Sequence, residues 1–286
     1  MKNLHNKQLL LLTLATILIS TSGSLGRFID LPTPLIIWSR GVLGAIFLFL
    51  FCKYKKLNIK LKSKEDLPTI ILGGVLLTAH WLTYFYALKL SNVALGMLSM
   101  FTFPVITALL EPFFTKTKLN PVHIILAFIV LLGIYILAPD FSFENTHLKG
   151  ILFGVLSAFC YALRNLILKR HVHKYEGSVL MMQQTFIASV ILLPTLFFLD
   201  SSNMPSQLPY LIILGLVTTA IGHSLFISSL KHFSVSTASI IGSSQPVFGI
   251  IIAFIFLNER PALNTFIGGS LILATVIIES IRSKKD

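Results

Sequence analysis

Two histidines lie inside long apolar stretches of this 286-residue chain, one in each half. His80 is followed by Trp81 and Tyr84, and His223 lies 143 positions further along. An imidazole changes its charge near neutral pH and can also hydrogen-bond a ligand. The two histidines and the aromatic side chains after His80 are therefore candidates for ligand binding or proton coupling. The alternative for each histidine is a structural role, with the ring donating to a backbone carbonyl.

Arg40 also lies inside an apolar stretch, where a permanent charge is costly. Arginine is hard to deprotonate, so its side chain must meet water, a carboxylate or an anionic group of a ligand. We therefore include Arg40 among the candidate binding residues. The structural alternatives are an ion pair with Asp30 and a side chain that extends outward to the membrane surface.

Gln245 carries a large amide that can both donate and accept hydrogen bonds. It follows Ser244 and precedes Pro246, and Pro104 stands at the matching position 142 residues earlier. A proline frees a backbone carbonyl and can bend a helix. Paired helix breaks at Pro104 and Pro246 predict a ligand site near Ser244 and Gln245. The alternative for the small residues around them is close packing between helices.

Glu111 is the deepest carboxylate in the apolar stretches. Burial favours the neutral form of a carboxyl group, so Glu111 is a candidate proton carrier. The alternative is a structural ion pair near the end of its helix, for which the sequence offers Lys116, Lys118 and Arg164.

The composition identifies the solvent in which these residues lie. Hydrophobic residues make up 55% of the chain and charged residues 12%, about half the charged share of a typical soluble domain. A helix needs about 20 apolar residues to cross the hydrocarbon of a bilayer, and such a stretch can satisfy its backbone there only as a helix. We predict an all-α polytopic membrane protein with ten spans, near residues 9–28, 34–52, 67–88, 93–114, 122–139, 149–168, 178–199, 209–230, 235–257 and 265–281.

The distribution of basic residues predicts the orientation. Most of the 23 Lys and Arg residues fall in alternate connections between the apolar stretches and at both termini. Positive residues mark the cytoplasmic side, so both termini are expected in the cytoplasm and the chain in a cytoplasmic or inner membrane. This also accounts for the net charge of +12 without a nucleic-acid partner, because the basic residues do not follow one face.

An internal repeat divides the chain. The spacing of 142 that relates Pro104 to Pro246 also relates Lys89 to Lys231 and Gly73 to Gly215. We predict two five-helix halves, residues 1–145 and 146–286, that enter the membrane from opposite sides as an inverted repeat. The alternative is chance similarity among apolar helices.

Several short motifs recur in the two halves or close them. They are Ala87-Leu88-Lys89, Pro104-Val105, Tyr161-Ala162-Leu163, Pro246-Val247 and Asn258-Glu259-Arg260-Pro261. With these motifs the chain resembles the drug/metabolite transporter superfamily, specifically its EamA-like branch of ten helices, and the resemblance covers nearly the whole chain as two tandem repeats. It implies a central cavity between the halves that opens alternately to each side, and export or exchange of amino acids, drugs or other metabolites.

No phosphate-binding loop, metal-ligand spacing or hydrolase motif stands in the sequence. We therefore expect no catalytic residue, metal or cofactor, and transport driven by protons, a counter-substrate or the substrate's own gradient. A lipid flippase or scramblase is the main alternative, and an intramembrane enzyme or an assembly subunit is another. The oligomeric state stays open, with a homodimer as one option. The predicted substrate-binding residues are Arg40, His80, Trp81, Tyr84, His223, Ser244 and Gln245.

Overall fold

The computed structural model describes residues 2–115, 120–137, 142, 144–169, 171–229, 231–233, 241–242 and 244–282. Within these ranges the chain is all-α and forms no strand. The helices are α1 (Lys2–Phe28), α2 (Thr33–Tyr54), η1 (Lys64–Asp66), α3 (Leu67–Leu90), α4 (Val93–Met100), α5 (Phe103–Thr115), α6 (Pro121–Leu137), α7 (Thr146–Leu168), α8 (Gly177–Leu192), α9 (Thr195–Phe198), α10 (Met204–Ile213), η2 (Leu214–His223), α11 (Ser224–Ser229), α13 (Gln245–Leu257) and α14 (Leu263–Arg282).

Seven helical segments in the described part of the chain are long and apolar enough to cross a membrane. Three more of the predicted spans correspond to shorter apolar helices, Pro121–Leu137, Gln245–Leu257 and Leu263–Ile278. A helix of 17 residues rises about 25 Å, slightly less than the hydrocarbon thickness. The structure thus confirms an all-α protein with several membrane-spanning helices, whereas ten spans and the inverted repeat remain predictions.

Both prolines predicted to break helices lie in the first turn of a helix. Pro104 is the second residue of α5, which begins after a break at Phe101 and Thr102. Pro246 is the second residue of α13. Proline is well tolerated there because the first turn needs no backbone N–H donor within the helix. The predicted ninth span also includes residues 235–240 and 243, which lie outside the described residues.

The eighth predicted span contains a long π-helix, η2, between α10 and α11. Its wider turns carry backbone hydrogen bonds from residue i to residue i−5, and such turns are often found at functional sites. The hydroxyl of Thr219 also donates to the carbonyl of Leu214, five residues earlier, at 2.9 Å. Thr219 and His223 both lie in this segment and both face α2, as described below.

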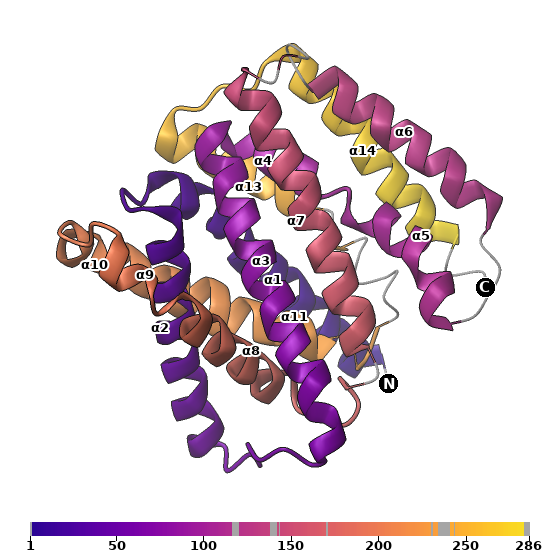
Figure 1. The fold of residues 1–286 in the computed structure, drawn as a ribbon. Helices are drawn as coiled ribbons and strands as arrows, with labels where there is room; N and C mark the ends of the chain where they lie inside the picture. The colour runs from indigo at the N-terminus through magenta and orange to yellow at the C-terminus, as the bar shows by residue number, and fades with distance from the viewer. Residues whose placement is uncertain are drawn as a thin grey trace.

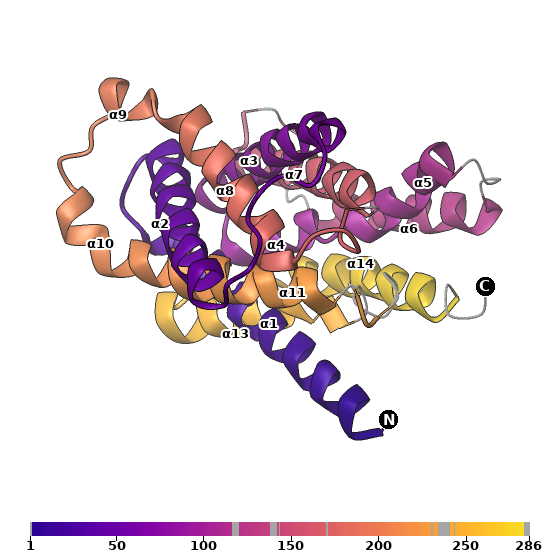
Figure 2. The same ribbon diagram turned by 90° about the horizontal axis from the view of Figure 1, so that it is seen from below.

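The helices pack so that α1, α2, α3, α7, η2 and α13 surround the middle of the molecule. α3 packs against α7, α2 against α8 and η2, and α1 against η2 and α13. α6 and α14 lie side by side at one edge (Figures 1 and 2). Large apolar side chains on this edge, such as Phe128 and Phe266, are exposed, as expected for a surface that faces lipid.

Two glycines let α2 and η2 approach closely. A Cβ on Gly44 would lie 2.9 Å from Thr219 Cγ2, and a Cβ on Gly215 would lie 2.7 Å from Leu43 Cβ. Both distances are shorter than side chains tolerate. The absence of a side chain at these positions therefore brings the backbone of α2 next to the π-helix, which sets the position of Arg40.

Candidate functional site

A small cavity lies among the central helices, and both predicted halves contribute to its wall. The space open to water-sized molecules is about 30 Å³, which is room for about two waters. Side chains in the wall must therefore move before a metabolite can enter. The cavity is lined by Ile19, Ser22, Arg40, His80, Trp81, Tyr84, Met100, Phe101, Phe103, Tyr161, His223, Phe226, Gly242 and Gln245.

The guanidinium of Arg40 is held by neutral groups from three helices. Its Nε donates to Thr219 Oγ1 at 2.7 Å and its Nη1 to Ser22 Oγ at 3.3 Å. Its Nη2 lies 3.1 Å from His223 Nε2. The guanidinium carbon also lies 3.9 Å from the ring centroid of Trp81, a distance typical of a cation–π contact. The side chain is 1% exposed.

No described carboxylate pairs with Arg40. The structural alternative of an ion pair with Asp30 is wrong, because the Asp30 carboxylate accepts from Asn203 and lies at a helix end. Neutral acceptors do not cancel a buried charge, and an uncompensated charge at membrane depth is costly. The arrangement is therefore suited to an anionic group entering the cavity.

The hydrogen bonds of the two histidines determine where each ring carries its proton. Ser157 Oγ donates to the backbone carbonyl of His80 at 2.9 Å, so at 2.7 Å it can only accept from His80 Nδ1. Arginine only donates, so His223 accepts at Nε2. His223 is then neutral with its proton on Nδ1, and His80 also carries a proton on Nδ1. His80 Nε2 has no hydrogen bond in the described structure, and in the neutral ring it is an acceptor available to a ligand.

Aromatic rings form much of the remaining wall. Phe103 and Tyr161 meet edge to face with their centroids 5.0 Å apart, and the ring of His80 lies 4.6 Å from that of Tyr161. Trp81 is 1% exposed, and its indole Nε1 has no hydrogen-bond partner among the described residues. A buried N–H without a partner is rare, so Trp81 Nε1 is a donor available for a bound ligand.

Comparison with known proteins identifies the family. The sequence model described as the EamA-like transporter family matches the chain twice, at residues 6–138 and 148–281. The chain belongs to the EamA-like transporter family. Because the two matches span nearly the whole chain, the resemblance inferred from the short motifs is confirmed.

Relatives of this EamA-like transporter are named as transporters. An uncharacterized transporter, YxxF, of Bacillus subtilis is 27% identical over 270 residues, covering 91% of this chain and 86% of the relative. The pseudopaline exporter CntI of Pseudomonas aeruginosa is 21% identical over 258 residues, covering 89% and 88%. A crystal structure of a protein with 18% sequence identity matches 98% of each chain with a TM-score of 0.71, which supports the fold.

The structure of this EamA-like transporter brings six of the seven predicted binding residues to one cavity. These are Arg40, His80, Trp81, Tyr84, His223 and Gln245. Ser244 does not line it, and its hydroxyl donates to the carbonyl of Ile241 at 2.6 Å. His80 also has the structural bond expected in the alternative interpretation, because its Nδ1 lies 3.2 Å from the carbonyl of Ser157. A histidine can be structural through one nitrogen and face a ligand through the other.

Glu111, the candidate proton carrier of this transporter, does not line the cavity. It lies in α5, is partly exposed, and its Oε1 is 2.6 Å from Lys169 Nζ. Lys116 and Lys118, two of the partners considered from the sequence, lie outside the described residues. Arg164 is buried elsewhere, and its Nε donates to Gln184 Oε1 at 2.7 Å.

Sequence reasoning did not select several residues that shape the transporter's cavity. Thr219 and Ser157 orient Arg40 and His80, but an isolated hydroxyl in an apolar helix gives no distinguishing signal. Phe101 and Phe103 line the cavity at the break between α4 and α5. Their nearness to Pro104 was the one available signal, since the chain around a helix break is where ligand sites are expected.

Proposed function

We propose that this EamA-like transporter is a secondary active transporter that exports or exchanges a small polar metabolite by alternating access. The substrate class is an amino acid or a related amine or drug, and we favour one that carries a carboxylate. The observation that supports this most directly is Arg40, a fully buried cation in the cavity wall with only neutral partners.

The cavity offers complementary groups for an amino acid. A carboxylate would pair with the Arg40 guanidinium, which matches it as a two-pronged donor. An ammonium group would find acceptors in His80 Nε2 and the Gln245 amide, and aromatic rings such as Tyr161 attract cations. Trp81 Nε1 is an additional donor. The apolar wall at Phe103 would then contact the substrate's side chain.

Alternating access is supported by the small volume of the cavity and by the two family matches. Helices from both matched regions form the wall, so movement of one region against the other would open it. We propose that residues 1–145 and 146–286 are inverted halves of five spans each, with both termini in the cytoplasm and the chain in a cytoplasmic or inner membrane. A relative is named as a pseudopaline exporter, which favours export.

Energy for transport is proposed to come from protons or from a counter-substrate. His80 and His223 line the cavity, and an imidazole can carry a proton. Glu111 lies outside the cavity and is ion-paired, which makes it the weaker proton carrier. The partners implied are the substrate, the lipid bilayer and one of these driving species.

The test is uptake of a labelled pool of amino acids, nucleosides and small amines into proteoliposomes. We expect amino acids or amines to accumulate when a pH gradient is imposed, or only after preloading if the protein is an exchanger. Arg40→Gln should strongly weaken uptake of carboxylated substrates at low concentration while the folded protein is retained. If folded wild-type protein takes up nothing under any of these conditions, the proposal is wrong, and movement of labelled phospholipid would then favour the flippase alternative.

A further inference from the structure

Two ion pairs have their basic residues at matching positions in the chain. Arg27 stands at the end of α1 and Lys169 directly after α7. They are 142 positions apart, the same spacing that relates Lys89 to Lys231 and Pro104 to Pro246. Each is paired with a glutamate: Arg27 Nε lies 3.4 Å from Glu259 Oε1, and Lys169 Nζ lies 2.6 Å from Glu111 Oε1.

Each pair crosses between the two predicted halves in the same way. Arg27 ends the first helix of the first half, and Glu259 follows α13, in the fourth predicted span of the second half. Lys169 follows the first helix of the second half, and Glu111 lies in α5, in the fourth predicted span of the first half. The two pairs are thus similar contacts with the halves exchanged, although the glutamates are 148 positions apart and do not share the spacing of 142.

The pairs lie at opposite ends of the helix bundle. Arg27 lies where α3 ends and α4 begins, since its Nη1 donates to the carbonyl of Lys89 at 2.7 Å. Lys169 lies near the other end of α3, because the neighbouring Leu168 packs against Gly73. With the proposed orientation, Arg27–Glu259 is at the external end and Lys169–Glu111 at the cytoplasmic end.

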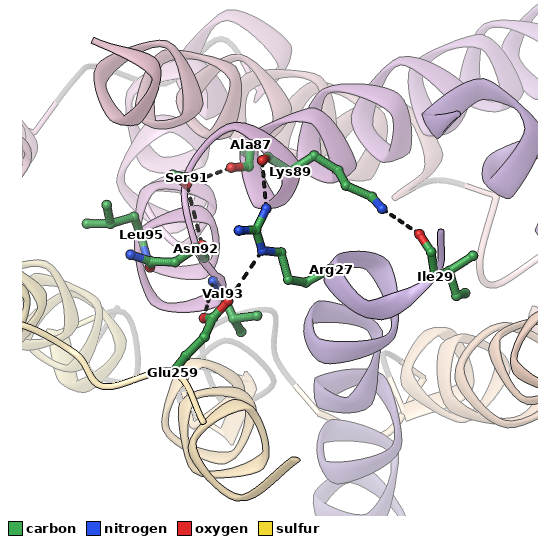
Figure 3. Close-up of polar contacts among 9 residues, drawn as sticks. All are labelled: Arg27, Ile29, Ala87, Lys89, Ser91, Asn92, Val93, Leu95 and Glu259. Atoms are coloured by element: carbon green, nitrogen blue, oxygen red, sulfur yellow. Dashed lines mark hydrogen bonds and ion pairs between the residues drawn. The ribbon is translucent and has the colours of Figure 1, made fainter. Parts of the chain in front are cut away.

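At the Arg27 end, the ion pair is part of a network that joins several cavity helices (Figure 3). Glu259 Oε2 accepts from the backbone N–H of Val93, the first residue of α4, at 2.9 Å. Lys89 Nζ donates to the carbonyl of Ile29, just after α1. The contacts connect α1, α3 and α4 with the end of α13, and all four helices contribute to the cavity wall. The Glu259 carboxylate is the group that joins the segment after α13 to α1 and α4 at this end.

We infer that Arg27–Glu259 and Lys169–Glu111 are the gating ion pairs of this transporter, which close the two ends of the substrate pathway and break in turn as the halves move. The inference rests on the proposed alternating-access mechanism and adds the four residues that control it. Both pairs are formed in this structure, in agreement with the small cavity. Similar contacts at opposite ends are expected if the halves are inverted copies that exchange roles between the two states.

The exposure of these side chains suits a contact that opens in every cycle. The exposed fractions are 37% for Arg27, 21% for Glu259, 47% for Lys169 and 39% for Glu111. Ion pairs with this much contact with solvent change an equilibrium by about fivefold at most. Loss of one pair should therefore shift the balance between states without unfolding the protein.

The chain also offers a matched control. Lys231 Nζ lies 2.9 Å from Glu176 Oε2, at similar exposure. Both residues belong to the second predicted half, so this pair does not cross between halves. Movement of one half against the other leaves it intact, and its removal should not change the balance between states.

The experiment measures access to the cavity without any substrate. Cys52 and Cys160 are replaced by serine, and Ile19→Cys, at the cavity wall, is labelled with a membrane-impermeant maleimide from outside intact cells. We expect Glu259→Gln to speed labelling about three- to fivefold and Glu111→Gln to slow it by a similar factor. Glu176→Gln should leave the rate unchanged. The charge-exchanged double variant R27E/E259R should restore the original rate.

Equal effects of E259Q and E111Q in the same direction, or effects no larger than that of E176Q, would overturn the inference. If E259Q fails to fold, Arg27→Gln breaks the same pair and tests the same expectation. Labelling needs no substrate. Opposite changes in the labelling rate in E259Q and E111Q would therefore support the gating pairs even if Arg40→Gln left uptake of carboxylates intact. The reverse outcome, normal Arg40-dependent uptake with unshifted labelling, would reject the gating pairs alone.

Discussion

Arg40 Nη2 and His223 Nε2 are 3.1 Å apart, although the two residues are separated by 183 positions in the sequence. The bond can form only while His223 is neutral, because the guanidinium has no acceptor. A proton on His223 would place two cations side by side. An entering carboxylate would relieve that repulsion, so substrate and proton should bind cooperatively at this site.

Cooperative binding predicts that the affinity for a carboxylated substrate rises as the pH falls. In His223→Gln the side chain cannot gain a charge, so this dependence of the affinity on pH should be lost. Binding to purified protein by calorimetry at several pH values measures this. A wild-type affinity that does not change with pH would contradict the coupling assigned to His223.

Arg40→Gln should raise the KM for a carboxylated substrate by about 10- to 100-fold, since a hydrogen-bonded charge is worth about 1.5–3 kcal/mol. Transport kinetics in proteoliposomes provide the measurement. The control is Arg164→Gln, which removes an equally buried arginine outside the cavity wall. It should lower thermal stability and leave KM unchanged, and the same rise in KM for both variants would argue against a direct contact with Arg40.

Trp81→Phe keeps the aromatic ring and removes the unpaired indole N–H. We expect unchanged or slightly higher thermal stability, because a buried donor without a partner is lost. Substrate affinity should fall by about fivefold or more if the N–H donates to the substrate. Trp38→Phe is the matched control, since its Nε1 is also buried without a partner but does not line the cavity. The substrate affinity of Trp38→Phe should stay at the wild-type value.

Gly44→Ala should destabilise the protein by about 1–3 kcal/mol, because the added Cβ would overlap Thr219 Cγ2 and push α2 away from η2. Thr219→Ser removes that methyl group and keeps the hydroxyl that accepts from Arg40. The double variant should therefore regain most of the lost stability. Thermal unfolding in detergent of the two single variants and the double variant measures the recovery. If the losses of stability simply add, the overlap with Thr219 Cγ2 is not the cause of the destabilisation by Gly44→Ala.

Lys174 joins the connection between α7 and α8 to Asp66, ahead of α3. The hydrogen bond to Asp66 raises the pKa of Lys174 above its ordinary value of 10.5. A raised folded-state pKa stabilises the fold below the unfolded pKa, and this contribution is lost as the pH rises through the folded value. Lys174→Gln should thus melt below wild type at pH 8, and the difference should shrink above about pH 10.5. If the difference in melting temperature persists at higher pH, the loss of stability comes from packing of the Lys174 side chain and not from its charge.

Composition and local pattern determined the class of this protein. Few charged residues and apolar stretches of about 20 residues leave helices in a bilayer as the only arrangement that satisfies the backbone. The prolines at 104 and 246 predicted where helices begin anew, because the loss of a backbone donor is a local property. Arg40, His80 and His223 could also be selected from the local sequence, because an ionisable side chain inside a membrane is costly whichever direction it faces.

Only the tertiary structure decided which of these groups meet. Arg40 reaches His223 because Gly44 and Gly215 allow α2 to approach a π-helix, and no local pattern predicted that helix type. Glu111 pairs with Lys169, 58 positions away, instead of facing the cavity. A side chain on an apolar helix can face lipid, a neighbouring helix or a cavity with the same local sequence. Packing between distant segments makes that choice, and with it the difference between a binding residue and a structural ion pair.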